Sequence, residues 1–308
     1  MSAPDKNPAG GLAFGFSAYL IWGFFPVFFK QLVAVTPLEI LAHRIAWSAL
    51  LLALLISFRH QWPQLSRLLI RPGDLRRLLL SALLISTNWL VFITAVEAGY
   101  VLQSSLGYFM TPLVNILLGR LILGETLRPW QKLSVALAVI GVLCQVFVVG
   151  QFPWVALILA STFGLYGLLR KTASFDALTG LAGETLVLTP VALGYLTWLG
   201  AADTMQFLHH TLSVDLLLPA SGVVTAIPLL LFASAARRLR LSTIGFLQYM
   251  TPTFHFMIAV LLYREPFGSA HLASFMLIWL ALAVYMADAT RSLRRPLSPA
   301  APPANPAV

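Results

Sequence analysis

The chain has 308 residues, of which 59% are hydrophobic and 10% are charged, and it carries a formal net charge of +9. Soluble domains average roughly 45–50% apolar and about 25% charged residues, so this composition excludes a water-soluble globule. It also excludes a disordered chain, because disorder requires low hydrophobicity. The single cysteine, Cys144, excludes a disulfide framework and a cysteine-based metal site. The composition is that of an integral membrane protein.

Ten long apolar runs, bounded by charged residues or by proline and glycine, predict ten membrane-spanning helices. A helix needs roughly 20 apolar residues to cross a hydrocarbon core about 30 Å thick. The predicted spans cover residues 11–34, 37–58, 77–96, 101–124, 131–150, 152–170, 177–199, 213–235, 241–263 and 269–287. The segments 1–10 and 291–308 are predicted to be disordered tails, which leaves five spans in residues 11–150 and five in 151–290.

The basic residues predict the orientation of these spans. If the spans alternate in direction, every Lys and Arg except Lys30, Arg44, Arg120 and Arg264 falls on one side of the membrane. The positive-inside rule then places both termini in the cytoplasm and the protein in the inner (plasma) membrane. The net charge therefore reflects topology, and we expect no nucleic-acid partner.

An internal repeat relates the two halves of the chain. Residues 81–127 align without a gap to residues 221–267 at an offset of 140, and both copies contain a Met-Thr-Pro motif. A glutamate, Glu125 or Glu265, lies thirteen residues beyond the proline in each copy. Five spans are an odd number, so the two copies must cross the membrane in opposite senses. Inverted repeats of this kind are a transporter architecture, although a duplication kept only for stability would leave the same pattern.

Several motifs resemble one family. They are the proline-containing fourth span that ends in Gly124-Glu125, EILAHRIAWS at 39–48, FGLYGLLRK at 163–171 and STIGFLQYMTP at 242–252. Together they resemble the EamA domain of the drug/metabolite transporter superfamily, and more specifically its RarD-type branch, over about residues 10–290. The resemblance implies an all-α fold of ten transmembrane helices in two inverted five-helix repeats. It also implies a chamber lined by spans one, three, four, six, eight and nine, and a small-molecule cargo such as an amino-acid-like or chloramphenicol-like solute.

Arg44 is the leading candidate for a binding residue. It lies seven residues beyond Pro37, hence about 10 Å below the outer interface at 1.5 Å per residue. A charge at such a depth is costly and marks a functional site by default. The planar guanidinium could hold a carboxylate, nitro or phosphate group. The alternative is that Arg44 joins helices through backbone carbonyls or an acidic partner.

Aromatic and amide side chains in the spans form a second candidate set. The residues predicted to line the chamber with Arg44 are Trp22, Asn88, Trp89, Tyr108, Tyr166, Gln248, Tyr249 and His255. A mostly apolar pocket with a few placed polar groups suits small organic solutes. Tyr108 and Gln248 are related by the repeat offset, so they are expected to face one cavity from opposite halves. For any single aromatic residue, packing in the core or against lipid is the alternative.

A third set concerns gating and coupling. Glu184 is the offset equivalent of Arg44, so the two charges could neutralise each other, or each could lie near one end of the transport pathway. Glu184 could also bind and release a coupling proton, or it could lock helices together. Glu39 and His43 share one helix face, which indicates either a pH-dependent outer gate or an interfacial hydrogen-bonded pair. Lys30 is predicted to face the outer vestibule. Pro112 and Pro252 each remove a backbone hydrogen bond, so they could act as hinges or free carbonyls for cargo.

These features predict an inner-membrane secondary transporter that exports small amphipathic metabolites or drugs by alternating access, with protons as a candidate coupling ion. A passive channel is one alternative. A membrane-embedded enzyme is another, and it would have to use the outer-loop group Asp203, His209, His210 and Asp215. No cofactor and no metal are expected. A monomer suffices to enclose a chamber, and a dimer stays open as an alternative.

Overall fold

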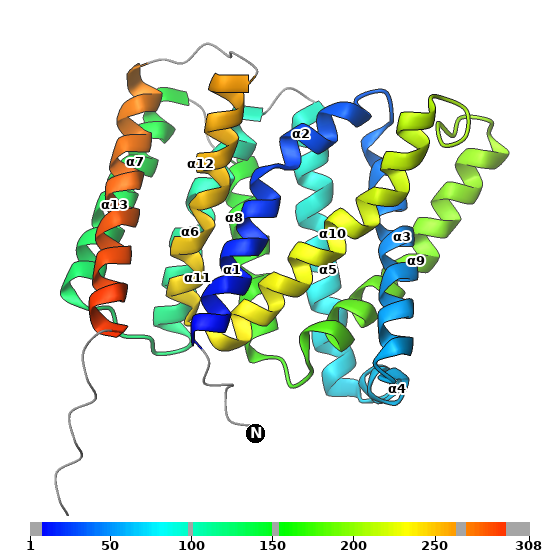
Figure 1. Ribbon diagram of the computed structural model, residues 1–308, viewed down its shortest axis with the longest axis horizontal. Coiled ribbons are helices and arrows are strands. Elements are labelled where there is room, and N and C mark those ends of the chain that lie inside the picture. Colours follow the sequence, from blue (N-terminus) through cyan, green and yellow to red (C-terminus); the bar gives the residue numbers. More distant parts are fainter. Residues whose placement is uncertain (1–7, 98–100, 150–153, 263–268, 294–308) are drawn as a thin grey trace, which may run out of the picture.

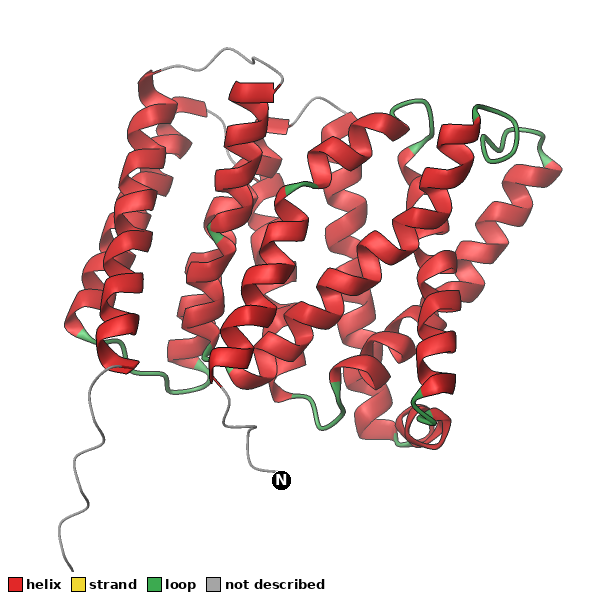
Figure 2. Cartoon of the chain, in the orientation of Figure 1, coloured by secondary structure: helices red, strands yellow, loops and turns green. Residues whose placement is uncertain are grey.

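The computed structural model describes residues 8–97, 101–149, 154–262 and 269–293, and all regular structure in these ranges is helical (Figure 2). The helices are α1 (Pro8–Gly23), α2 (Phe25–Phe29), η1 (Lys30–Leu32), α3 (Pro37–Phe58), α4 (Trp62–Ile70), α5 (Pro72–Glu97), α6 (Val101–Leu121), α7 (Pro129–Val149), α8 (Trp154–Thr172), α9 (Ala177–Ala201), α10 (Leu212–Arg238), α11 (Leu241–Gln248), α12 (Met250–Met257), η2 (Ile258–Leu262) and α13 (Ser269–Leu293). The predicted all-α fold class is therefore confirmed.

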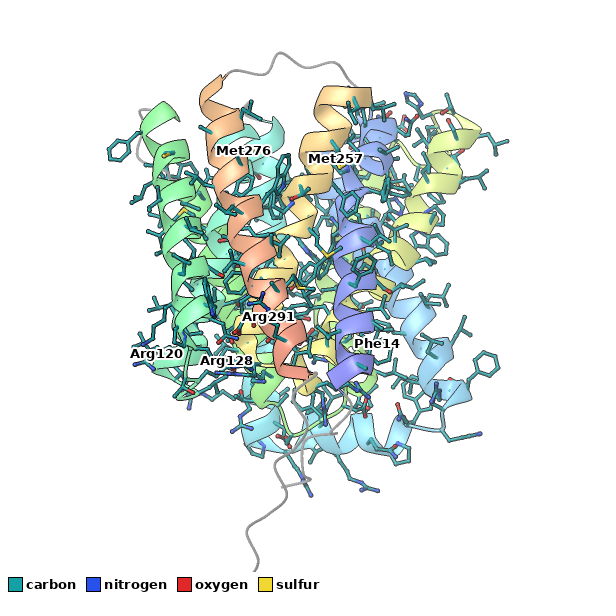
Figure 3. The ribbon with its side chains drawn as sticks, turned by 60° about the vertical axis from the view of Figure 1, so that its left-hand side comes forward. Phe14, Arg120, Arg128, Met257, Met276 and Arg291 are labelled. Atoms are coloured by element: carbon teal, nitrogen blue, oxygen red, sulfur yellow. The ribbon has the colours of Figure 1, made fainter. Side chains whose placement is uncertain are left out.

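The long helices stand side by side and reverse direction from one to the next (Figure 1). α1 begins and α13 ends at the same end of the molecule. Arg120, Arg128 and Arg291 lie toward this end, whereas Met257 and Met276 lie toward the opposite one (Figure 3). We call the first the basic end. The positive-inside rule predicts that this end faces the cytoplasm.

Each of the ten predicted spans coincides with one helix or one series of consecutive helices in the described residues. Within the part of the chain that the structure describes, five segments are long and apolar enough to cross a membrane by length and composition, so this is a multi-pass membrane protein. They are Ala9–Leu32, Pro37–Phe58, Pro72–Ala95, Ala177–Ala201 and Leu212–Arg238. The total of ten spans stays a prediction, and Arg264 and Glu265 of the repeat lie outside the described residues.

The stretch 59–76, expected to be a connection, contains an additional helix. α4 buries Leu65 and Leu68 against α5 and α9, whereas Trp62 and Ile70 are exposed. Two leucines three residues apart lie on one face of a helix, which is enough to anchor a short amphipathic segment at the basic end. α5 accordingly begins at Pro72, five residues before the predicted start of its span.

The two central prolines have different effects. α6 continues through Pro112, whereas the ninth span is divided into α11 and α12 at Tyr249, three residues before Pro252. Proline has no N–H to donate to the carbonyl four residues earlier, so a break of the helix at this point is expected. A π-helical turn, η2, follows α12.

Several of the main helix contacts have a counterpart when the two halves are exchanged. α3 packs on α9, α6 on α11 and α7 on α13, which are pairs of corresponding helices. The contact of α1 with α10 has its counterpart in that of α8 with α5, and the contact of α3 with α10 has its counterpart in that of α9 with α5. This exchange pattern is what two related halves would produce.

Candidate functional site

Arg44 lies in the interior, where α3 crosses α10. Pro37 occupies the first turn of α3, after Thr36 in an extended conformation, and the helix then carries Arg44 inward. α3 and α10 approach closely because Gly222 has no side chain: a Cβ there would lie 2.5 Å from that of Trp47. Ser48 also donates to the Gly222 carbonyl at 2.9 Å. The close crossing brings Thr225 of α10 to the Arg44 side chain.

The Arg44 guanidinium is held by a hydroxyl and by aromatic rings. Arg44 is 4% exposed, and its Nε donates a hydrogen bond to Thr225 Oγ1 at 2.8 Å. The guanidinium carbon lies 4.7 Å from the ring centre of Trp89 and 5.0 Å from that of Phe29. Among the described residues, no carboxylate lies within 4.0 Å of it. The positive charge therefore has ring and hydroxyl partners but no counter-ion.

Two more of the predicted chamber residues lie near Arg44. Tyr108 is close enough to interact with Arg44 electrostatically, and its ring contacts that of His255 at 5.6 Å between centroids. A ring nitrogen of His255 lies 3.1 Å from the carbonyl oxygen of Trp22. Arg44, Trp89, Tyr108 and His255 thus form one connected group, which we call the Arg44 site.

The other predicted aromatic and amide residues have different neighbours. Asn88 turns toward α8, where its amide donates to the Leu159 carbonyl and to Thr162 Oγ1, both at 2.9 Å. Trp22 packs against Phe163 and Phe232, and Tyr166 stacks on Phe232. These rings form the core between α1, α8 and α10.

Gln248 and Tyr249 belong to the contact between α6 and α11. Gln248 Oε1 accepts a hydrogen bond from Asn115 Nδ2 at 3.0 Å. Tyr249 is fully buried beside Phe246 in the cluster that contains Tyr285, and its hydroxyl has no hydrogen-bond partner among the described residues. Although the two residues are adjacent in sequence, Gln248 bonds to α6 and Tyr249 packs in a different apolar cluster. None of the contacts described for either residue is with Arg44.

Glu184 lies in a buried polar cluster in which both of its carboxylate oxygens accept hydrogen bonds. The residue is 1% exposed, and Arg170 Nη1 lies 3.3 Å from its Oε1. Ser81 Oγ donates to the same oxygen at 2.6 Å, and the Tyr166 hydroxyl donates to Oε2 at 3.2 Å. The carboxylate thus joins α5, α8 and α9. Glu184 and Arg44 have separate partners, so the two charges do not neutralise each other by direct contact.

Arg170 is the functional candidate that the sequence reasoning missed. It was assigned only as an orientation signal, but it is 2% exposed and pairs with Glu184. Its Nη2 donates to the Ala177 carbonyl at 2.9 Å, and its guanidinium lies 5.6 Å from the ring centre of Phe175. A Cβ on Gly180 would lie 2.0 Å from Arg170 Nη1, so only glycine leaves room for this arrangement.

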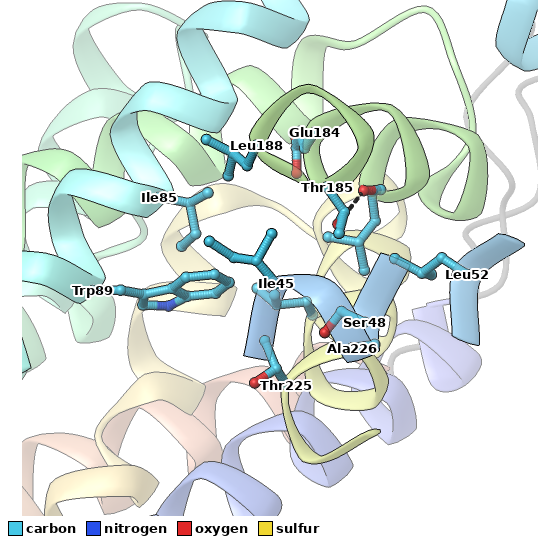
Figure 4. A pocket seen from close by; sticks show the side chains of 12 residues that line it. Ile45, Ser48, Leu52, Ile85, Trp89, Glu184, Thr185, Leu188, Thr225 and Ala226 are labelled. Carbon is cyan, nitrogen blue, oxygen red and sulfur yellow. Dashed lines mark hydrogen bonds between the residues drawn. The ribbon is translucent and has the colours of Figure 1, made fainter. Parts of the chain in front are cut away.

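A small cavity lies between the surroundings of the two charges (Figure 4). It encloses about 10 Å³, which is about the room that one water molecule requires. Trp89 and Thr225, which contact Arg44, line it together with Glu184. The remaining wall is mostly aliphatic and comprises Ile45, Ser48, Leu52, Ile85, Leu181, Thr185, Leu188, Ala226 and Leu229. In this conformation the cavity between the two charges has no room for an organic solute.

A larger cavity of about 310 Å³ opens at the basic end. Its lining comes from α4, the start of α5 and the connection between α8 and α9: Gln64, Arg67, Leu68, Arg71, Asp74, Ser174, Phe175, Asp176 and Thr179. Asp176 also caps α9 by accepting from the backbone N–H of Thr179 at 2.9 Å. Thr179 in the wall of the open cavity and Glu184 in that of the closed one are about 7.5 Å apart along α9. Arg170 contacts Phe175 of the open cavity and Glu184 of the closed one, so it lies between the two linings.

Glu39 and His43, the residues of the predicted outer gate, lie against the connection between α9 and α10. Glu39 is fully buried, and its Oε1 accepts from the backbone N–H groups of Gln206 at 2.8 Å and Phe207 at 3.1 Å. His43 Nε2 lies 4.0 Å from that oxygen, which is too long for a hydrogen bond, and its Nδ1 accepts from Trp47 at 3.2 Å. The carboxylate therefore attaches the α9–α10 connection to α3.

The other predicted polar residues lie around the same end. Lys30 is exposed in η1. In the α9–α10 connection, His209 and His210 contact a carbonyl and a hydroxyl of the same segment. Asp215, in the first turn of α10, accepts a hydrogen bond from the backbone N–H of Leu208 in that connection at 2.7 Å. These groups have local partners within the connection.

The fold and the buried charges define a multi-pass, all-helical membrane protein, and comparison with known proteins gives its family. The model of the EamA-like transporter family matches residues 9–147. An uncharacterized transporter of Vibrio cholerae is 47% identical over 290 residues, which cover 94% of this chain and 96% of that protein. Protein RarD of Escherichia coli is 44% identical, with 94% and 98% covered. The chain belongs to the EamA-like transporter family, in the RarD-type branch of the drug/metabolite transporter superfamily.

Two further similarities extend this result. A chloramphenicol-sensitive protein RarD of Pseudomonas aeruginosa is 35% identical, with 92% of this chain and 96% of that protein covered. One solved protein structure superposes with a TM-score of 0.71 at 19% identity, covering 94% of this chain and 100% of the other. At that identity the solved structure supports the fold alone. The family resemblance read from the sequence motifs is confirmed.

Proposed function

We propose that this protein is a secondary transporter of the inner membrane that exports small amphipathic metabolites or drugs by alternating access. Ten spans in two inverted repeats, 11–150 and 151–290, would enclose one solute chamber, with both termini in the cytoplasm. The exchange of helix contacts between the two halves supports this organisation. A single chain is enough to form the chamber. Amino-acid-like and chloramphenicol-like solutes are the first candidates for cargo.

The observation that best supports the proposal is that two cavities lie one after the other along α9. The open one reaches from the basic end to Thr179, and the closed one begins at Leu181 and Glu184. Solute would enter from the cytoplasm through the open cavity. It would reach the chamber when the Arg170–Glu184 pair separates, and would leave after the helices close again at the basic end.

Separation of this pair also suggests how protons could couple to transport. While Arg170 and two hydroxyls surround Glu184, they offset part of the cost of burying an ionised carboxylate. Once the pair separates in a low-dielectric chamber, the carboxylate would take up a proton. Glu184 is therefore our candidate for the coupling residue.

Flux into proteoliposomes tests the proposal. Purified full-length protein should give saturable uptake of a radiolabelled solute, stimulated by unlabelled solute inside the vesicles. Glu184→Gln should remove the response of that uptake to a pH gradient, whereas Arg291→Gln, a change at the exposed end of α13, should keep it. Linear uptake without counter-transport would indicate a passive channel. An unchanged pH response in Glu184→Gln would refute proton coupling through this residue.

A further inference from the structure

The charge balance of the Arg44 site limits what it can bind. We propose that the site takes the carboxylate of a monoanionic, amphipathic solute. This inference rests on the proposed transport function, because it specifies the cargo of the same chamber. It follows from three properties of the site: an uncompensated charge, an apolar and aromatic wall, and the number of basic groups.

The first property is the missing counter-ion. Burying a cation in an apolar interior is costly unless an anion or several hydrogen bonds compensate it. Thr225 occupies only the Nε of Arg44, and the two terminal nitrogens have no hydrogen-bond partner among the described residues. These two nitrogens form the edge of the guanidinium that binds a carboxylate in a bidentate manner. The edge is thus available to a ligand.

The second property is the wall around the charge. The rings of Trp89, Phe29 and Phe25 lie 4.7, 5.0 and 6.0 Å from the guanidinium carbon. The adjoining cavity adds aliphatic side chains such as Ile45 and Leu188. Such a wall favours an apolar or aromatic body attached to the anionic group. The rings also stabilise the cation while no ligand is bound, which is consistent with a chamber closed around its own side chains.

The third property distinguishes a carboxylate from the other groups that an arginine can hold. One guanidinium neutralises one negative charge, and the residues that contact Arg44 or line the closed cavity include no other Lys or Arg. Glu184, which also lines this cavity, is already paired with Arg170. A phosphate dianion would leave an excess negative charge in an apolar chamber. A neutral nitro group would leave the arginine uncompensated. A carboxylate monoanion balances the site.

A matched pair of ligands tests the inference. 3-Phenylpropionate and 3-phenylpropionamide have the same body and differ in charge at pH 7. Binding to the purified full-length protein should be at least about tenfold tighter for the acid. Arg44→Gln should remove this preference, Arg44→Lys should retain part of it, and Arg291→Gln should leave it unchanged. Phenyl phosphate, the dianionic probe, should bind more weakly than the acid.

The outcomes separate this inference from the proposed function. Equal binding of acid and amide, binding of neither, or a preference that survives in Arg44→Gln would overturn the carboxylate assignment. Saturable uptake of the amide without the acid would do the same while leaving the transport function intact. If the acid binds through Arg44 but no probe is taken up by proteoliposomes, the ligand class stands and the transport function fails.

Discussion

Arg44 and Glu184 occupy corresponding positions in the two halves of the chain, and their surroundings differ in one decisive respect. Both are buried charged residues on corresponding helices, α3 and α9. Glu184 has a basic partner, Arg170, and two hydroxyl donors. Arg44 has one hydroxyl acceptor and a set of aromatic rings.

We propose that this difference reflects two roles: Glu184 belongs to an ion pair that joins helices and separates during transport, whereas Arg44 binds the solute. The Glu184 cluster is electrically balanced and joins three helices, so we expect it to keep the closed cavity apart from the open one at the basic end without help from cargo. The Arg44 site is balanced only when an anion enters. Two corresponding positions can thus supply the gate and the binding site of one transport cycle.

The largest expected effect comes from removing the counter-ion of Glu184. Arg170→Met leaves a buried, uncompensated carboxylate, so the free energy of unfolding should fall by about 3–5 kcal/mol. Thermal unfolding of the detergent-purified protein measures the loss. The double variant Arg170→Met with Glu184→Leu should recover most of it, because both charges are then absent. A single variant as stable as the wild type would mean that the pair does not hold the helices together.

A smaller loss is expected at the hydroxyl that completes the same cluster. Ser81→Ala removes the 2.6 Å hydrogen bond to Glu184 while Arg170 and Tyr166 remain. Hydrogen bonds to charged groups contribute roughly 1.5–3 kcal/mol, and we expect a loss of about 1.5 kcal/mol because two partners are kept. The same thermal unfolding assay applies, with Ser86→Ala on an exposed face of α5 as the control. Equal stability of the two variants would mean that the hydrogen bond from Ser81 to Glu184 does not stabilise the protein.

The helices and Arg44 were predictable because they depend on local signals. Apolar runs and their charged boundaries predict helices, and the distance of Arg44 from Pro37 gives its depth in the membrane. The role of Arg170 was not predictable in the same way. It ends a span, where the positive-inside rule already accounts for a basic residue, and only tertiary packing brings it onto Glu184.

Two further details depend on contacts between distant segments. Gln248 and Tyr249 are adjacent in sequence, but one bonds to Asn115 and the other packs beside Phe246. Their placement is determined by which helices meet at the break between α11 and α12. Similarly, Glu39 and His43 share a helix face, yet Glu39 bonds to the backbone of a connection that follows 167 residues later. Helix periodicity predicts a shared face and does not predict the partner on it.

The orientation of Arg44 can be tested without removing its charge. Thr225→Val keeps the volume of the side chain but removes the oxygen that accepts the 2.8 Å hydrogen bond from Arg44 Nε. The guanidinium edge should then be less well positioned, and binding of 3-phenylpropionate should weaken about tenfold. Isothermal titration measures this change, with Thr253→Val in α12 as the control. Unchanged affinity would mean that the rings alone position Arg44.

The smallest expected change in stability belongs to Arg44→Met. This variant tests the difference between the Arg44 and Glu184 sites most directly, because Arg170→Met, which removes a charge from the Glu184 site, should be strongly destabilising. Arg44→Met removes a buried charge that has no counter-ion. The free-energy cost of burying that charge then disappears, which offsets the loss of the hydrogen bond and of the ring contacts. The free energy of unfolding without ligand should therefore stay within about 1 kcal/mol of the wild type, while carboxylate binding is lost. Thermal unfolding with and without 3-phenylpropionate measures both quantities on one sample. If Arg44→Met lost as much stability as Arg170→Met, Arg44 would have to be a second structural lock, and the distinction between the two sites would not hold.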